Sequence, residues 1–180
     1  MPSGITYIRN ETNDDWIPIA KGVGAGGGGG GLTTGYHAMP AAAVTVATGT
    51  TTLIPTTTAT FDINGEHDSA TGRWICGADG VYLVFAQCYF ATGTTGYRNV
   101  YIYKNATTTG TPGVLATGTR IGLGQSTDAN GEEFPIAMCL VQLVATDYLE
   151  LFVRHSQGSP LVCGDTATYP YSWLGIVRIN

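Results

Sequence analysis

Apolar and polar positions alternate along this chain over short stretches, which is the spacing of β-strands rather than of helices. The longest apolar run, residues 80–90, is rich in β-branched and aromatic side chains and starts at a glycine, so it predicts a strand. Residues 147–155 also alternate clearly. Residues 97–104 place tyrosines at odd positions and Val and Ile at even ones. Neither face of this last strand is wholly polar, so we expect the core to cover one face and a neighbour to cover the other.

About eight to ten antiparallel strands are expected along the chain. Further strand-like runs follow one another at regular spacing over residues 43–47, 56–63, 119–124, 134–144 and 172–179. No segment has a convincing helical period. This pattern predicts an all-β fold, a jelly-roll sandwich of two sheets. A chain of 180 residues is long enough to bury such a core without disulfide staples.

The N-terminal part of the chain has a different organisation. Two apolar runs, residues 5–8 and 16–19, flank a polar turn and predict a hairpin within an attachment unit of residues 1–21. A lone hairpin is marginally stable, so we expect it to pack on trimer mates or on a larger partner. Residues 22–40 hold six consecutive glycines and predict a flexible linker, the alternative being close packing of three chains around an axis. The head domain is predicted over residues 41–180.

Charge and composition narrow the classes of function. Only 12% of the residues are charged, and the net charge is −5 with the eight basic residues scattered. A nucleic-acid partner requires a basic stripe, so none is expected. No signal peptide is visible, and no apolar stretch is long enough for membrane insertion. The four cysteines form no Cys-x-x-Cys pair, which favours buried free thiols, with disulfides as the alternative.

The sequence holds no recognisable catalytic constellation. His155 and Ser156 are neighbours, but neighbours on a strand point to opposite faces. There is no Gly-x-Ser-x-Gly elbow either. The chain is therefore predicted not to be an enzyme.

One segment has the composition of a calcium loop. Asp62, Asn64, Glu66 and Asp68 occupy alternate positions around a glycine and carry the hard oxygen ligands that Ca²⁺ prefers. The complete twelve-residue loop with its closing glutamate is missing. The alternative is that Asp and Asn act here as ordinary turn formers. Calcium is thus the only candidate cofactor, and none is required.

Three stretches form a recognisable set. Residues 74–85 hold an aromatic residue, a Gly-x-Tyr turn and an apolar strand. Residues 147–151 begin with the aspartate of a Thr-Asp turn, Thr146-Asp147, and residues 173–177 form a closing Trp-x-Gly strand. This order resembles the superfamily of complement globular heads and tumour-necrosis-factor-like jelly rolls, which often has Gly-Asp at the turn. The resemblance covers roughly residues 41–180 and implies the jelly-roll fold.

Within that superfamily, the threonine-rich texture and the strand at residues 97–105 are most similar to copies in bacteriophage virion proteins. The opening of the chain, with Tyr7, Ile8, Trp16 and Ile17, resembles short attachment segments of phage structural proteins. The resemblance implies a homotrimer. Its N-terminal hairpin would dock onto other virion proteins through these four residues, and its jelly roll would project outward.

Four aromatic residues are the candidates for the trimer interface. Tyr101 and Tyr103 share one strand face, and Tyr148 and Phe152 share another. Aromatic residues are enriched in interface cores. The alternative is that these side chains fill the core of the monomer. A cyclic trimer would also set three binding faces side by side, so that a weak contact gains avidity.

The function expected from the sequence is that of a non-enzymatic, trimeric structural protein on the surface of a bacteriophage virion. It would serve as a capsid or tail decoration or as a fibre, and it would be made in the host cytoplasm. One alternative is a receptor-binding head that contacts a host glycan or surface protein. The other is a cellular trimeric binding module.

Overall fold

The computed structural model describes residues 6–9, 16–19, 34–93, 95–127, 131–164 and 171–179. The chain separates into two compact units, Met1–Leu32 and Thr33–Asn180. In the first unit, strand β1 (Thr6–Arg9) pairs antiparallel with β2 (Trp16–Ile19), so the predicted hairpin is present. The side chains of both strands, including the four predicted anchor residues, and the run of glycines lie outside the described residues.

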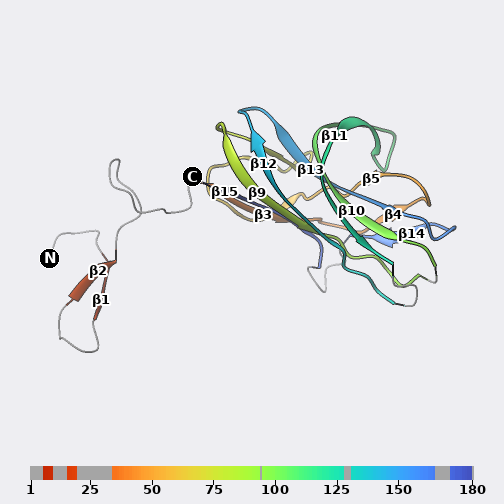
Figure 1. Cartoon of the computed structure of the whole chain (residues 1–180), viewed down its shortest axis with the longest axis horizontal. Coiled ribbons are helices and arrows are strands. Elements are labelled where there is room, and N and C mark those ends of the chain that lie inside the picture. The colour runs from red at the N-terminus through yellow and green to blue at the C-terminus, as the bar shows by residue number, and fades with distance from the viewer. Residues whose placement is uncertain are drawn as a thin grey trace. The chain divides into compact units, whose positions relative to one another are not determined.

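The second unit, which we call the head, is built of antiparallel strands and contains no helix over its described residues (Figure 1). Its eight longer strands are β3 (Gly35–Met39), β6 (Thr58–Asp62), β9 (Gly80–Gln87), β10 (Arg98–Thr109), β11 (Val114–Ser126), β12 (Ile136–Leu143), β13 (Tyr148–His155) and β15 (Trp173–Ile179). Its short strands are β4 (Val44–Val46), β5 (Thr52–Leu53), β7 (His67–Asp68), β8 (Arg73–Ile75) and β14 (Leu161–Cys163). The described part of the chain therefore offers no helix that could cross a membrane.

Two sheets face each other across the core of the head (Figure 1). The larger has the strand order β10-β11-β5-β13-β8-β7, and the other has the order β12-β9-β15-β3-β6. Strands β14 and β4 form a small separate pair. Alternate side chains of each strand point inward, so Tyr82 and Val84 of one sheet join Trp74, Leu149 and Leu151 of the other in one hydrophobic cluster. This arrangement is the predicted jelly-roll sandwich.

The head begins earlier than the sequence predicts. Strand β3 lies within residues 22–40, the predicted linker, yet it pairs with β15 and β6 in the interior of the five-stranded sheet. The side chains of Tyr36 and Ala38 on β3 are 0% exposed. The physical reason is that two inward-facing side chains suffice to hold a five-residue strand. Because this short alternation directly follows a glycine-rich run, the sequence pattern predicts a linker here.

Strands β10, β11, β5 and β13 close into a ring, because β10 and β5 each pair with both β11 and β13. These four strands supply a second hydrophobic cluster, made of Tyr101, Ala106, Phe152, Leu53, Tyr103 and Leu115. The opposite face of β10 places Val100 and Ile102 in the main core. Both faces of this strand are therefore covered, as predicted, but the chain itself covers the second face and no neighbour is needed.

Candidate functional site

One face of the five-stranded sheet is apolar and open to solvent. Strand β9 shows why this face is apolar. Tyr82 and Val84 point into the core, whereas Val81, Leu83 and Phe85 point to the other side. Apolar side chains at both odd and even positions give a strand two apolar faces, and the sandwich core covers only one of them. We call the uncovered side the apolar face.

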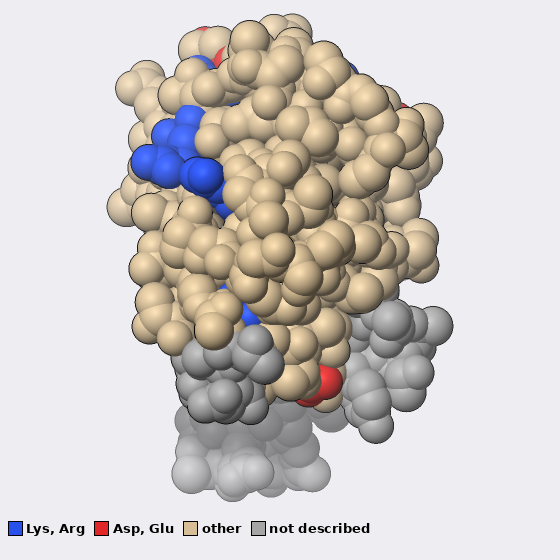
Figure 2. All heavy atoms as spheres, turned by 90° about the vertical axis from the view of Figure 1, so that its right-hand side faces the viewer, with Lys and Arg blue, Asp and Glu red and all other residues tan. Residues whose placement is uncertain are grey.

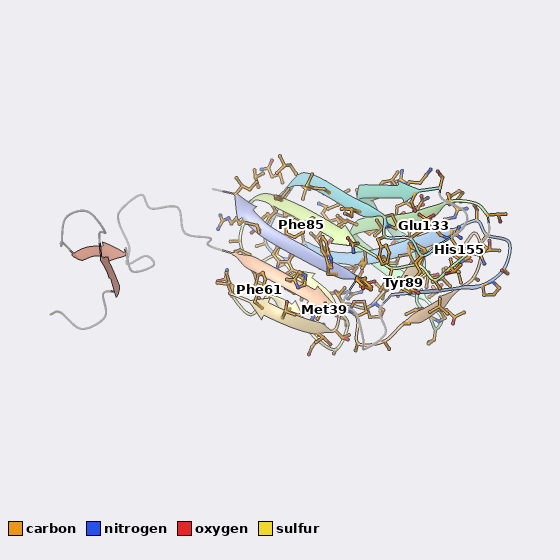
Figure 3. All side chains as sticks on the ribbon, turned by 90° about the horizontal axis from the view of Figure 1, so that it is seen from below. Met39, Phe61, Phe85, Tyr89, Glu133 and His155 are labelled. Atoms are coloured by element: carbon orange, nitrogen blue, oxygen red, sulfur yellow. The ribbon has the colours of Figure 1, made fainter. Side chains whose placement is uncertain are left out.

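The strand register aligns the side chains of this face into rows. One row runs from Met138 on β12 through Phe85 on β9 and Gly175 on β15 to His37 on β3 and Phe61 on β6. Two neighbouring rows are Leu140–Leu83–Val177 and Gln142–Val81–Ile179. Figure 3 shows the side chains of this sheet, with Phe61, Met39 and Phe85 labelled. The first row crosses all five strands, and the other two extend the face over β12, β9 and β15.

The side chains of the apolar face are much more accessible than a folded monomer requires. Met138 is 68% exposed, Leu140 65% and Ile136 57% on β12, while Phe61 is 51% and Ile179 45% exposed. Single exposed apolar residues are ordinary, but a large contiguous patch marks a surface that binds another molecule. The apolar face is therefore the candidate interaction site of the head.

An aromatic strip crosses the middle of the apolar face. The ring of His37 stacks on Phe61 at 6.0 Å and lies 5.9 Å from Trp173, whose ring meets Phe85 edge-on at 5.6 Å. The Phe85 ring covers Gly175, where an added Cβ would lie 2.2 Å from a ring carbon. Glycine at this position lets the ring lie flat on the sheet. Burial among these rings lowers the pKa of His37 below its ordinary value.

A second aromatic group extends the apolar face at one end. The ring of Phe134 lies 5.7 Å from Tyr89 and 5.1 Å from Tyr171, and each of the three residues lies two positions from the end of a strand of this sheet. Phe134 and Tyr171 are about two-fifths exposed. The Tyr89 hydroxyl donates to Glu132 at 3.0 Å, so this end of the face combines aromatic surface with polar atoms.

The four residues predicted for the trimer interface do not lie on the apolar face. Tyr101 is 4% and Phe152 0% exposed, because both fill the second cluster of the six-stranded sheet. Tyr103 packs edge-on against Phe152 at 5.1 Å. The Tyr148 hydroxyl donates to the carbonyl of Ala106 at 2.7 Å. The monomer-core alternative thus holds for Tyr101 and Phe152, which leave almost no area for a partner.

The residues that sequence reasoning missed are those of β12, above all Ile136, Met138 and Leu140. A signal for them exists in the sequence. In residues 134–144 every even position except Gln142 carries a large apolar side chain, beside the alternating Ala137, Cys139 and Leu143. A strand with two apolar faces predicts a covered outer face here, just as it does for residues 97–104.

The predicted calcium segment uses its carboxylates for internal hydrogen bonds. Asp62 accepts from the backbone N–H groups of Glu66 at 3.0 Å and His67 at 2.9 Å. Glu66 accepts from the N–H of Gly77 at 3.1 Å and from the indole of Trp74 at 3.2 Å. Burial raises the pKa of Glu66, and these two hydrogen bonds oppose that shift. Both carboxylates therefore hold the loop in shape.

The other two calcium candidates also face local partners. Asp68 accepts from the N–H of Ala70 at 3.0 Å and from the hydroxyl of Thr71 at 2.7 Å, and Asn64 donates to Thr34 at 2.9 Å. Among the described residues, no group of three or more His, Cys, Asp or Glu side chains is placed to hold a metal ion. The described contacts show these residues acting as turn formers, and calcium binding stays a prediction.

The remaining predicted groups are part of the fold. None of the four cysteines forms a disulfide, and Cys76, Cys88 and Cys163 are buried, as expected. His155 is 0% exposed and bonds through its Nε2 atom to the carbonyl of Val46 at 2.9 Å. Burial lowers the pKa of His155, so its neutral form fits this site.

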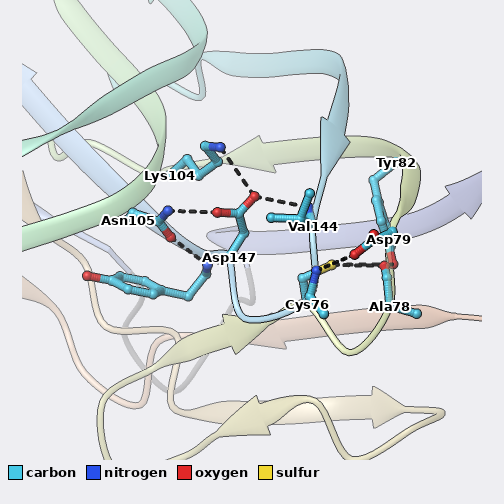
Figure 4. A network of polar contacts seen from close by, with 10 residues as sticks. Cys76, Ala78, Asp79, Tyr82, Lys104, Asn105, Val144 and Asp147 are labelled. Carbon is cyan, nitrogen blue, oxygen red and sulfur yellow. Dashed lines mark hydrogen bonds and ion pairs between the residues drawn. The ribbon is translucent and has the colours of Figure 1, made fainter.

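The Thr-Asp turn named in the sequence joins β12 to β13 and is the centre of a polar network (Figure 4). The Asp147 carboxylate accepts from the N–H of Val144 at 3.1 Å, from Asn105 at 2.7 Å and from Lys104 at 3.2 Å. Burial raises the pKa of Asp147, but these three partners outweigh it, so the net pKa is lowered. The aspartate of this motif therefore ties the turn to β10.

Thr146 has a φ of 78°, in the left-handed region where a β-branched side chain is strained and glycine is not. We expect Thr146→Gly to stabilise the head by up to about 1 kcal/mol, the strain relieved being partly offset by the greater freedom of glycine in the unfolded chain. Urea unfolding measures the change. Thr146→Ala, which keeps the Cβ, is the control, and equal stability of the Gly and Ala variants would contradict the argument.

Comparison with solved structures places this fold. Murine APRIL at pH 5.0 matches with a TM-score of 0.58 and 12% identity over 81% of this chain and 98% of that one. The globular domain of zebrafish complement 1qA gives a TM-score of 0.52 and 10% identity over 82% and 98% of the two chains. Eiger TNF from S. frugiperda gives 0.52 and 15% identity over 82% and 91%. No protein-family model matches the chain, and no curated protein sequence matches it significantly.

These similarities define a class of fold. The head is a jelly roll of the kind found in tumour-necrosis-factor-like proteins and complement globular heads, as the three sequence motifs predicted. At identities of 10 to 15% the comparison concerns the fold alone. None of these three neighbours is a bacteriophage protein, so the phage link stays a prediction.

Proposed function

We propose that this protein is a non-enzymatic homotrimer that assembles through the apolar face of its head. The observation that carries the proposal is the continuous apolar surface over β12, β9, β15, β3 and β6, with Met138 and Leu140 about two-thirds exposed. Burying each such side chain is worth about 1.5–3 kcal/mol. A second support is the resemblance to a superfamily whose jelly rolls imply a trimer.

The low charge of the head also supports self-association. Charged residues are 12% of the chain, whereas about a quarter is usual. Figure 2 shows one end of the head, on which nearly all side chains are uncharged and one group of Lys and Arg stands apart. Charged residues are depleted in the cores of interfaces, so a sparsely charged surface suits a protein that works within an assembly.

The particular assembly we propose is a bacteriophage virion. Residues 1–21 attach the protein to other virion proteins through Tyr7, Ile8, Trp16 and Ile17, and the head projects from the virion surface as a decoration or fibre. The threonine-rich sequence and the antiparallel pairing of β1 with β2 support this proposal. The alternative roles are a receptor-binding head for a host glycan or surface protein and a cellular trimeric module.

Two measurements test the proposal. Light scattering on the full chain and on residues 33–180 is expected to give three times the protomer mass in both, which for the full chain is three times 18.8 kDa. Deletion of residues 1–20 is expected to abolish co-purification with particles and to leave the trimer intact. A monomeric head would overturn the trimer, and particle attachment that survives the deletion would overturn the anchor.

A further inference from the structure

A second surface, on the six-stranded sheet, gathers polar and basic side chains around an unsatisfied acceptor. Asn99 on β10 lies opposite Arg154 on β13 and Gln125 on β11. Its amide nitrogen donates to the Tyr101 hydroxyl at 2.8 Å. Its Oδ1 atom is buried and has no hydrogen-bond partner in the chain. The whole residue is only 7% exposed. A buried acceptor left without a donor costs about 1–3 kcal/mol, so this oxygen calls for a donor from outside the chain.

Two arginines lie on the strands that pair with this part of β10, Arg154 opposite Asn99 and Arg120 opposite Tyr103. The guanidinium of Arg120 lies 5.4 Å from the centre of the Tyr101 ring, next to Asn99. Arg154 is held by a hydrogen bond from its Nε atom to the carbonyl of Gly49 at 2.9 Å, so its position is fixed by the loop before β5. Neither arginine forms an ion pair with a carboxylate among the described residues. Two such cations stand out in a chain that has only eight basic residues.

Tyr103 lies on the same face of β10 as Asn99 and Tyr101. It faces Arg120 across the β10–β11 pairing. Burial raises the pKa of the Tyr103 hydroxyl, and the positive charges of Arg120 and Arg154 both oppose that shift. The nearest carboxylate by register, Glu150, is bound to Arg73 at 3.0 Å and does not neutralise them.

We propose that Asn99, Arg120 and Arg154 form a binding site for an acidic saccharide, a sugar that carries a carboxylate. The arginines would form charge-assisted hydrogen bonds with the carboxylate, and a ring hydroxyl would donate to the Asn99 Oδ1 atom. A sugar acid brings a carboxylate and donor hydroxyls together on one ring, whereas a fully ionised anion such as sulfate has no donor for this oxygen. The proposal rests for its biological setting on the alternative role of a receptor-binding head for a host glycan.

The test uses the full chain and trigalacturonic acid as the probe, with the neutral methyl ester of the same sugar for comparison. Binding is measured by calorimetry at low and at moderate salt. We expect the acid to bind and the ester not to bind, with affinity falling as salt rises. Arg120→Gln and Arg154→Gln are each expected to weaken binding about tenfold. Arg178→Gln, which removes the same charge from β15 of the other sheet, is the control.

Three results would overturn the site: no binding of the acid by the unchanged protein, equal binding of the ester, or an equal loss in Arg178→Gln. The first of these results is expected if a water molecule alone satisfies Asn99. Light scattering on the same samples separates this proposal from the trimer. If the protein is a monomer and binds the acid, the trimer proposal is wrong and the binding site is supported. If the protein is a trimer and does not bind the acid, the trimer is supported and the binding site is wrong.

Discussion

Leu140→Glu is expected to convert the proposed trimer into monomers. Leu140 is 65% exposed in the single chain, so a glutamate there remains hydrated and leaves the folded head intact. In the trimer the same carboxylate would be buried against an apolar surface without a partner, which is strongly unfavourable. Three copies of the charge around one axis would repel each other as well. Light scattering should give one protomer mass, with a circular dichroism spectrum unchanged from that of the parent.

The matched control for this variant is Val162→Glu. Val162 is 39% exposed and lies on β14, outside the five-stranded sheet. The Val162→Glu variant introduces the same charge at another exposed strand position, and we expect the protein to remain a trimer. Met138→Glu, in the row next to Leu140, should behave like Leu140→Glu. A trimer that withstands both β12 variants would place the interface elsewhere on the head and would remove the role given to the apolar face.

The strands that could be predicted from the sequence are those whose pattern is long. Strands β9, β13 and β15 each carry seven or eight residues of apolar or alternating character, and each lies within a few residues of its expected bounds. Such strands are specified locally, because every inward position contributes to the same core. Strand β3 was missed since only Tyr36 and Ala38 mark its buried face, and its pairing with β15 depends on residues far away in the chain.

The candidate sites show where local reasoning fails. The sequence predicts Tyr101 and Phe152 to be interface residues because a strand with a second apolar face must bury that face against something. In the structure the ring of β10, β11, β5 and β13 buries it within the same chain. Ring closure depends on the pairing of β5 with β13, which no local pattern reveals. The acidic segment read as a calcium loop because carboxylates that accept backbone N–H groups and carboxylates that bind Ca²⁺ look alike in a sequence.

The Thr-Asp turn is a case in which a motif carried structural information. Thr146-Asp147 stands where the superfamily often has Gly-Asp. The structure shows that the Asp147 carboxylate joins the end of β12, through Val144, to Asn105 on β10. It also shows why glycine is common before it, because Thr146 adopts a positive φ at this point. The role of the motif that the structure shows lies within the fold, where Asp147 ties the turn between β12 and β13 to β10.

Trp74→Ala is expected to destabilise the head by about 3–5 kcal/mol, which is the usual loss for truncation of a buried Trp. Trp74 on β8 is 0% exposed and its ring meets Tyr82 edge-on at 5.3 Å. Its removal leaves a cavity between the two sheets. It also takes away the indole N–H that Glu66 accepts at 3.2 Å. Urea unfolding at one fixed protomer concentration measures the loss, because assembly adds to the apparent stability of a trimer.

The variant Trp74→Phe separates the two contributions. Phenylalanine keeps much of the ring volume against Tyr82 and removes the hydrogen bond to Glu66, so a smaller loss of about 1–2 kcal/mol is expected. If the two variants are equally unstable, the hydrogen bond dominates and packing between the sheets is secondary at this point. If Trp74→Ala costs less than about 1 kcal/mol, Trp74 does not fill the core as described, and the aromatic residue that opens the sequence motif must have a role other than packing.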